Sequence, residues 1–304
     1  MALSRDGSDM NTVSGRLAPT RDRIGIALVL ASGVGFGTLG IFGLYAQRAA
    51  LSIPTVLAFR FLLAALAVWM LLAVRGRLTV LRGRTLAIAL GLGAFGYATQ
   101  SGLYFLGLEY MTAGLVAIVL YTYPAFVVVI AVAGLDERAT PAMGVALCLA
   151  LGGVALVTGA DPAGASPIGI AVVLGAAVAY AGYISVSRAL LVSVDPLVLT
   201  AHMLPAAGGV FVAIGAATGE LSVPTAPSAW LLLACLAVPA TALPVIAFFA
   251  GLRYVGASRA GIVSTVEPPV TVGLGAALFA EPVTAATVVG GALILLGVVV
   301  LERE

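Results

Sequence analysis

The chain is a succession of apolar runs, each close to 20 residues long and separated by short charged, Pro-rich or Gly-rich breaks. A helix of about 20 apolar residues spans the roughly 30 Å hydrocarbon core of a bilayer. Apolar residues make up 62% of the 304 residues and charged residues only 9%, whereas soluble domains carry about 25% charged residues. We therefore predict an all-α integral membrane protein with ten transmembrane helices, at approximately 24–45, 54–74, 85–106, 113–135, 141–158, 167–187, 196–217, 228–251, 257–279 and 284–301.

The arginines predict how these spans are oriented. The chain contains no lysine, and its 15 basic residues are all arginines. An even number of spans places both termini on one side, and every arginine except Arg48 and Arg60 then lies in a segment on that side. Because cytoplasmic loops are enriched in positive charge, we expect both termini in the cytoplasm. Residues 1–23 are polar and mixed in charge, which predicts a disordered cytoplasmic tail.

The two halves of the chain repeat each other. A shift of 144 residues lays FLGLEYMTA, which begins at Phe105, over FAGLRYVGA, which begins at Phe249. Each half holds five spans, and an odd number of spans turns the second copy upside down. We expect one five-helix repeat at 24–160 and a second, inverted repeat at 161–304, an architecture typical of secondary transporters. The inverted repeat favours alternating access about a central site formed by spans 1, 3, 4, 6, 8 and 9.

Two short motifs occupy corresponding positions in the repeats. E-P at 267–268 is followed by E-P-V-T at 281–284, and Y-P at 123–124 is followed by E-R-A-T at 137–140. In these motifs the chain resembles the EamA-type, ten-helix branch of the drug/metabolite transporter superfamily, and the resemblance covers nearly all of the chain from about Ile24. The motifs are specific to the superfamily and not to a substrate.

The resemblance implies a secondary transporter that exports small metabolites, in particular amino acids including aromatic ones, across the bacterial inner (plasma) membrane. A multidrug or other metabolite efflux carrier is the alternative, and a channel or receptor is a weaker one. The expected partners are a small-molecule substrate and the lipid bilayer, with no nucleic acid and no cofactor. Proton coupling and the oligomeric state are left open. An enzyme is not expected, because one histidine and two isolated cysteines provide neither a catalytic pair nor a metal site.

Glu267 is the first candidate for a substrate-binding residue, because it lies in the middle of the predicted ninth span. A carboxylate at that depth costs free energy unless it is paired, protonated or facing water, so intramembrane acids are functional by default. Pro268 and Pro269 follow it, and each frees a backbone carbonyl one turn back, here those of Ser264 and Thr265. Glu267 and the Ser264 carbonyl would suit a proton or a substrate ammonium group. The alternative is an acid that only shapes the kink.

The third span carries a polar stripe. Tyr97, Gln100, Ser101 and Tyr104 are spaced for one helical face, which must point away from lipid. We expect Tyr97, Gln100 and Tyr104 to line a central cavity. A polar seam that joins two helices by hydrogen bonds would use the same face.

Four prolines are predicted hinges. Pro239 and Pro244 lie in the eighth span, which matches the third span in the repeat but offers a kink instead of side-chain donors. Pro124 in the fourth span corresponds to Pro268 in the ninth. We expect these two to face each other across the cavity near the midplane of the membrane.

Four further residues have two interpretations each. His202 could relay protons or contact substrate, or it could form an interhelical hydrogen bond. Arg60 could meet a substrate carboxylate, but snorkelling to the outer headgroups explains it more simply. Tyr121 and Tyr183 could form walls around an aromatic substrate, or they could pack in the core. Glu281 precedes the tenth span, and we interpret it as a carboxylate at the N-terminal end of that helix.

Overall fold

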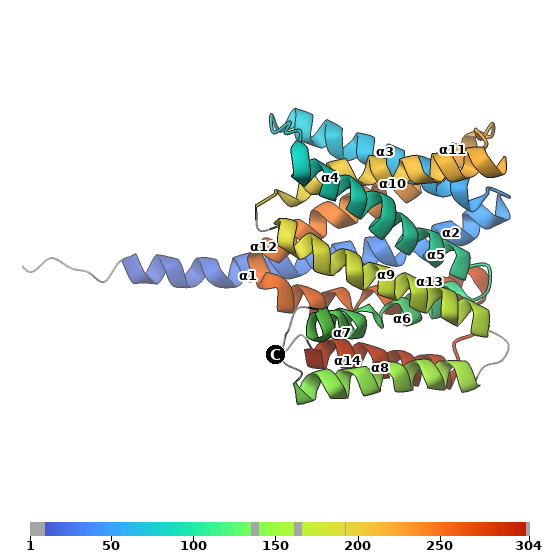
Figure 1. Cartoon of the computed structure of the whole chain (residues 1–304). Helices are drawn as coiled ribbons and strands as arrows, with labels where there is room; N and C mark the ends of the chain where they lie inside the picture. The colour runs from blue at the N-terminus through green and yellow to red at the C-terminus, as the bar shows by residue number, and fades with distance from the viewer. Residues whose placement is uncertain (1–9, 135–139, 161–165, 192, 302–304) are drawn as a thin grey trace, which may run out of the picture.

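The computed structural model is a bundle of helices from which the first helix extends (Figure 1). The structure describes residues 10–134, 140–160, 166–191 and 193–301, and none of them forms a strand. The first half contains α1 (Met10–Gly37), α2 (Leu39–Arg48), α3 (Ile53–Val74), α4 (Gly83–Gly91), the π-helix η1 (Leu92–Tyr97), α5 (Ala98–Gly107), α6 (Ala113–Leu120), α7 (Tyr123–Gly134) and α8 (Pro141–Ala160). The second half contains α9 (Pro167–Leu191), α10 (Pro196–Thr218), α11 (Pro227–Ala237), the π-helix η2 (Val238–Ala242), α12 (Leu243–Ser264), α13 (Glu267–Phe279) and α14 (Ala285–Leu301).

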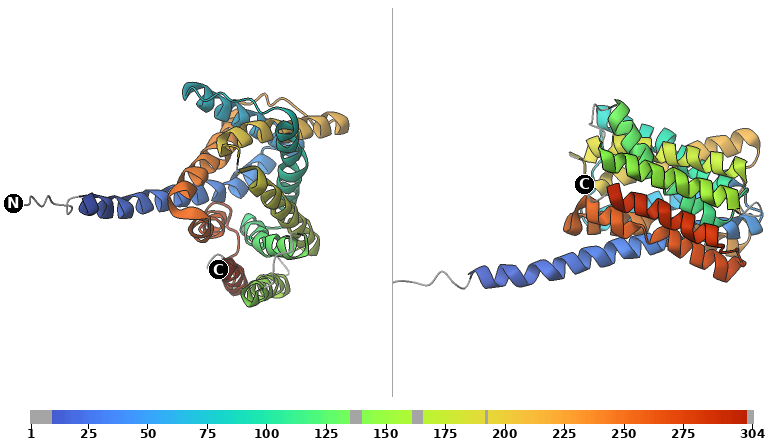
Figure 2. Two further views of the ribbon diagram at one scale, coloured as in Figure 1. Left: turned by 60° about the vertical axis from the view of Figure 1, so that its left-hand side comes forward. Right: turned by 90° about the horizontal axis from the view of Figure 1, so that it is seen from below.

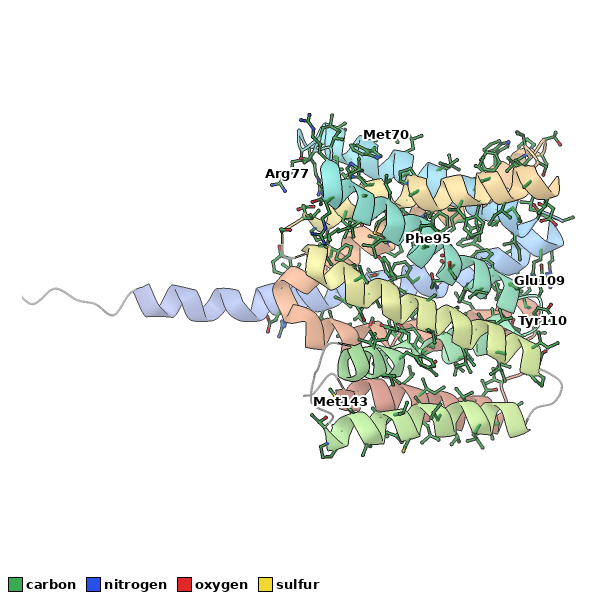
Figure 3. The ribbon with its side chains drawn as sticks, viewed as in Figure 1. Met70, Arg77, Phe95, Glu109, Tyr110 and Met143 are labelled. Carbon is green, nitrogen blue, oxygen red and sulfur yellow. The ribbon has the colours of Figure 1, made fainter. Side chains whose placement is uncertain are left out.

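The helices have the lengths and surfaces of a multi-pass membrane protein. Six helical stretches in the described part are long and apolar enough to cross a membrane, and shorter apolar helices accompany them. Met70 and Phe95 are exposed along the side of the bundle, whereas Arg77 and Glu109 lie toward its two ends (Figure 3). An apolar side with charged ends is the surface expected of a protein embedded in lipid.

Both α1 and α14 have their terminal segments at the same end of the bundle (Figure 1). We call this the terminal end and the opposite one the distal end. α1 begins at Met10, inside the segment that we expected to be a tail, because helical hydrogen bonding continues into polar residues once an apolar turn has formed. The chain therefore enters the bundle as a helix.

The chain reversal between the predicted eighth and ninth spans differs from expectation. α12 is helical from Leu243 to Ser264 and includes the segment where we expected a loop. α1 follows it closely: Gly35 lies against Pro244, Gly25 against Tyr254 and Gly33 against the Ser264 carbonyl. Residues 252–256, where we expected the loop, contain no proline. The backbone therefore bends there while it keeps its helical hydrogen bonds.

The pairing of helices reflects the two repeats. α3 packs on α10 and α8 on α14, so two helices each contact their own repeat counterpart, and α6 of the first repeat packs on α13 of the second. α8 and α14 lie side by side at one edge of the bundle (Figures 1 and 2). The contact of α1 with α12 corresponds to that of α9 with α5. The first repeat starts at the terminal end and α9 starts at the distal end, so the second copy is inverted.

Irregular backbone also recurs at matching positions. The π-helices η1 and η2 both lie in the middle of the third pass of their repeat. The fourth pass of each repeat is broken, at Tyr121–Thr122 between α6 and α7 and at Thr265–Val266 between α12 and α13. Irregular backbone within a membrane is tolerated where it is buried in protein or lines a cavity. These four places therefore direct attention to the interior of the bundle.

Candidate functional site

Glu267 is the first residue of α13, directly after the break in the fourth pass of the second repeat. Pro268 takes the second position, where a missing N–H costs nothing because that donor has no partner inside the helix. The proline thus starts a helix instead of kinking one. The Ser264 carbonyl accepts a hydrogen bond from the Tyr121 phenol at 2.7 Å, and its use by a substrate stays a prediction.

Tyr121 joins this break to the equivalent break in the first repeat. Its hydroxyl oxygen lies 2.7 Å from the Ser264 carbonyl oxygen and 3.0 Å from Oε2 of Glu267. A phenol has one hydrogen to donate, and a carbonyl and a carboxylate only accept. When Tyr121 donates to Ser264, the Glu267 contact needs a proton on the carboxyl group. When Glu267 is ionised, Tyr121 donates to it and the Ser264 carbonyl is left to another donor.

A row of aromatic rings starts at Tyr121 and crosses the interior. Each ring in turn lies close to the next: the centroids of Tyr121 and Tyr123 are 5.8 Å apart, those of Tyr123 and Tyr180 4.6 Å, those of Tyr180 and Tyr183 5.9 Å, and those of Tyr183 and Tyr97 5.6 Å. We call these five residues the tyrosine row. The planes of Tyr180 and Tyr183 are within 8° of parallel. The row connects Glu267 with η1 and offers ring faces for stacking.

The polar stripe of the third pass faces inward, as predicted. Gln100, Ser101 and Tyr104 are buried on α5, and Tyr97 is the last residue of η1. The Ser101 hydroxyl donates to Oε1 of Gln100 at 3.1 Å. Tyr97 and Tyr104 each interact electrostatically with Glu267 and also with Arg60. Two residues of the stripe are therefore electrostatic neighbours of both Glu267 and Arg60.

Arg60 corrects the sequence interpretation. The side chain is 1% exposed and does not snorkel to the headgroups. It lies seven residues after Ile53, about 10 Å along α3 from the start of that helix. Its Nε donates to the Thr241 hydroxyl at 2.8 Å, and its guanidinium carbon lies 4.7 Å from the centroid of the Phe61 ring. Snorkelling fails because these partners hold the side chain inside the bundle.

Thr241 is a site residue that the sequence interpretation missed. We expected a kink without side-chain donors in this pass, but Thr241 in η2 donates to the Leu236 carbonyl at 2.8 Å and accepts from Arg60. The π-helix contains Pro239 and is followed by Pro244, and it places this hydroxyl toward α3. Thr241 matches Tyr97 of the third span in the repeat, and this correspondence was the available signal. Whether the four prolines act as hinges stays a prediction.

His202 lies apart from this group and has both ring nitrogens occupied. Nδ1 is 2.8 Å from the Val198 carbonyl and donates to it, because Nε2 accepts from the Leu81 N–H at 3.2 Å. Trp69 packs edge-on against the ring, with centroids 5.1 Å apart. The histidine thus ties the connection before α4 to α10. These hydrogen bonds run within α10 and to a connection, not to another helix, and the structure does not bring His202 together with Glu267.

At the distal end, Glu281 joins the two repeats. Its Oε1 accepts from the Ala113 N–H at 2.8 Å and its Oε2 from the Gly114 N–H at 3.2 Å. It therefore caps α6 of the first repeat, not the helix that follows it, as we had interpreted. The helix dipole argument holds, but the partner helix is a different one. A Cβ on Gly275 would overlap with this carboxylate, so a larger residue there would displace Glu281 from its present position.

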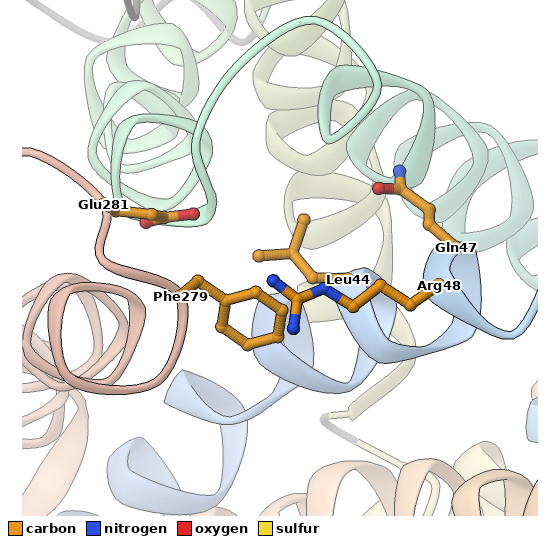
Figure 4. A pocket seen from close by; sticks show the side chains of 5 residues that line it. All are labelled: Leu44, Gln47, Arg48, Phe279 and Glu281. Atoms are coloured by element: carbon orange, nitrogen blue, oxygen red, sulfur yellow. The ribbon is translucent and has the colours of Figure 1, made fainter.

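A cavity of about 460 Å³ opens beside this cap (Figure 4). It is lined by Leu44, Gln47, Arg48, Phe279 and Glu281. The Arg48 guanidinium lies over the Phe279 ring at 4.2 Å from its centroid. The ring of Phe279 also meets that of Tyr45, at 4.9 Å. The distal ends of α2, α6 and α13 are thus fastened to one another.

The part of the chain that the structure describes brings no three His, Cys, Asp or Glu side chains close enough to hold a metal ion. The interior group consists instead of one carboxyl group, one guanidinium, phenols, an amide and hydroxyls. Such a set can bind and orient a small polar molecule and exchange a proton with it.

Comparisons with known proteins agree with this architecture. The chain is 28% identical over 218 residues, 70% of this chain and 76% of the relative, to an uncharacterized transporter of Archaeoglobus fulgidus. It is 30% identical over 215 residues, 66% of this chain and 67% of the relative, to the uncharacterized transporter YcbK of Bacillus subtilis. A crystal structure of another protein matches the fold with a TM-score of 0.65 and 22% identity, covering 93% of this chain and 95% of the other.

The model of the EamA-like transporter family matches the chain twice, at residues 23–159 and 167–303. The two matches fall one in each half of the bundle, in agreement with the helix pairing described above. The chain belongs to the EamA-like transporter family, within the drug/metabolite transporter superfamily.

Proposed function

We propose that this protein is a secondary transporter that exports amino acids, including aromatic ones, by alternating access. The observation that carries the proposal is the contact of Tyr121 with both Ser264 and Glu267, which joins the broken passes of the two repeats at one acid. Its proposed binding groups are Glu267, Ser264, Tyr121, Tyr183, Tyr97, Gln100, Tyr104 and Arg60. Unwound backbone carbonyls beside broken helices are the usual cation-binding groups of such carriers.

Coupling to protons follows from the number of hydrogens available at Tyr121: its phenol has one hydrogen and two nearby acceptors. A protonated Glu267 completes the network without cargo, because Tyr121 then donates to the Ser264 carbonyl. When Glu267 is ionised, Tyr121 donates to its carboxylate, and a cargo ammonium group can donate to the same carboxylate and to the Ser264 carbonyl oxygen, which has two lone pairs. Proton and cargo therefore compete for the same acceptors. A carrier in which they compete exchanges one for the other across the membrane.

The tyrosine row supports an aromatic cargo. Its ring faces, from Tyr121 to Tyr97, form a surface of the kind on which an aromatic side chain stacks. The same row would suit an aromatic cation without a carboxylate, which is the observation in favour of drug efflux as the second candidate. The two candidates differ in whether cargo with an amino group alone is carried as well as a complete amino acid.

The contacts between the two repeats at the distal end support alternating access. Glu281, Arg48 and Phe279 link the distal ends of helices from both repeats. These contacts must separate for cargo to leave the interior on that side. We place the protein in the bacterial inner membrane with both termini in the cytoplasm, since Arg77 and the other arginines of the connection between α3 and α4 lie at the terminal end. Opening of the distal end would then release cargo outward.

Glu267→Gln tests the function. The purified full-length chain, reconstituted in liposomes, is assayed for uptake of a panel of amino acids with and without a pH gradient. We expect the wild type to accumulate at least one of them in response to the gradient. Glu267→Gln should lose most of this uptake and its response to pH, because the amide cannot exchange a proton. Its thermal stability should be nearly unchanged.

Glu109→Gln is the matched control, because Glu109 is exposed at the distal end. Its uptake should equal that of the wild type. Full gradient-driven uptake by Glu267→Gln would show that the assigned acid is not the coupling site. Preferred uptake of 2-phenylethylamine over every amino acid would favour the efflux candidate.

A further inference from the structure

Arg60 carries a positive charge in the interior, and its hydrogen bonds are incomplete. Among the described residues, its Nη1 is the one buried side-chain nitrogen or oxygen without a hydrogen-bond partner. Arg60 Nε is satisfied by Thr241, but Nη1 is not. A buried charged donor without an acceptor costs several kcal/mol relative to a paired one, so such groups mark binding sites more often than structural ones.

The surroundings of Arg60 stabilise its charge without neutralising it. Its guanidinium carbon lies 4.7 Å from the centroid of Phe61 and 5.6 Å from that of Phe105. The phenols of Tyr97 and Tyr104 are its electrostatic neighbours, and the Tyr97 phenol is also a hydrogen-bonding neighbour of the guanidinium. Ring faces and phenols favour a cation but carry no full negative charge. An anion is therefore the missing partner.

We propose that Nη1 of Arg60 is the anion subsite of the transport site and that it binds a carboxylate of the cargo. This inference rests on the proposed transport function and adds a requirement to it: the cargo carries a carboxylate. A guanidinium is suited to the role because its planar donors match the two oxygens of a carboxylate. Thr241 positions the guanidinium through Nε and leaves Nη1 to the cargo.

The second charge of the interior completes the argument. Glu267 and Arg60 share two neighbours, since the phenols of Tyr97 and Tyr104 interact electrostatically with both residues. The site thus offers a carboxyl group and a guanidinium cation. A zwitterion, with an ammonium group and a carboxylate, matches both charges at once. An amine or an anion alone would leave one of them unpaired.

Three probes that share a benzyl ring separate these possibilities: L-phenylalanine, 2-phenylethylamine and 3-phenylpropanoate. The measurement is the rise in the Tm of the purified full-length chain in detergent with probe concentration, at constant pH and ionic strength. We expect the wild type to bind L-phenylalanine roughly 10- to 100-fold more tightly than 2-phenylethylamine. It should also respond to 3-phenylpropanoate.

Arg60→Met should lose the response to 3-phenylpropanoate and bind L-phenylalanine and 2-phenylethylamine about equally, with its response to the amine retained. Arg77→Met is the control, because Arg77 is exposed at the terminal end, and should behave as the wild type. If Arg60→Met does not fold, the wild-type comparison of the three probes still decides.

Two results would overturn the proposal. The first is a wild type that binds L-phenylalanine no more tightly than 2-phenylethylamine or that ignores both carboxylates. The second is an Arg60→Met variant that still distinguishes carboxylates as the wild type does. Uptake of 2-phenylethylamine in liposomes, with no effect of the carboxylates, would remove the anion subsite and leave transport itself standing.

Discussion

Among the side chains that the structure describes, Glu267 and Arg60 are the charged groups around the central tyrosines, and each contacts uncharged partners. Glu267 contacts Tyr121, and Arg60 contacts Thr241. A charged side chain inside a membrane bundle costs free energy, so such residues are generally functional. At Tyr121 the single phenol hydrogen can be donated either to the Ser264 carbonyl or to the Glu267 carboxyl group, but not to both at once.

Tyr121→Phe removes this hydrogen and leaves the ring in place. We expect loss of most gradient-driven uptake. The free energy of unfolding should also decrease by about 1–3 kcal/mol, because the hydrogen bond donated by the Tyr121 phenol is lost. Uptake in liposomes and thermal unfolding measure the two effects. Tyr110→Phe, at an exposed phenol, is the control. Normal coupling in Tyr121→Phe would contradict the proposed competition between proton and cargo.

His202→Phe tests the structural assignment of the histidine. The variant keeps a ring beside Trp69 but removes the acceptor of the Leu81 N–H and the donor to Val198. It should lower the free energy of unfolding by about 1–3 kcal/mol and leave the substrate preference unchanged. Unfolding and uptake are measured on the same preparation. An unchanged stability with lost proton coupling would show that His202 is a proton relay after all.

At the scale of elements, the irregular segments are the informative ones. Each repeat has a π-helix in its third pass and a break in its fourth. π-helices occur frequently at functional sites because the wider turn redirects side chains. Here η1 ends at Tyr97 and η2 carries Thr241, so both contribute to the group around Arg60. Glu281 adds a cap between elements of opposite repeats.

Glu281→Ala removes that cap. The free energy of unfolding should fall by about 0.5–2 kcal/mol, the usual cost of losing an N-cap. The distal ends of α6 and α13 should also separate more readily, which shifts the carrier toward the state open at that end. Thermal unfolding and the accessibility of a cysteine placed at Leu44 to a thiol reagent measure these effects. Glu109→Ala is the control, and equal accessibility in both variants would argue against a gate.

At the scale of the whole molecule, much of the architecture follows from the sequence. The apolar runs predict the membrane bundle, and the shift of 144 residues predicts two repeats. Both patterns can be read from the residue types alone, without knowing which segments are in contact. The inward face of Gln100 and Tyr104 follows from helical spacing. The depth of Arg60, the role of Thr241 and the partner of Glu281 could not be predicted. Each depends on contacts between segments far apart in sequence, which periodicity does not encode.

Movement of the two repeats against each other is a further prediction at this scale. Tyr45 and Phe279 are in ring contact at the distal end, from α2 and α13. A Tyr45→Cys/Phe279→Cys pair, in a chain whose Cys148 and Cys235 are replaced by Ala, can be linked by a bifunctional methanethiosulfonate reagent that spans the gap left by the two rings. Cross-linking should stop uptake nearly completely, and reduction of the cross-link should restore it. Each single cysteine variant is the control, and full uptake while linked would exclude opening at this end.

The central claim is that a proton and the cargo compete for Glu267. Proton release on cargo binding tests it most directly, in a weakly buffered solution of the purified protein with an indicator dye. Addition of the amino acid that the uptake panel identifies should release protons from the wild type and none from Glu267→Gln. Cargo binding to the wild type without proton release, over the pH range in which uptake responds to the gradient, would contradict the account.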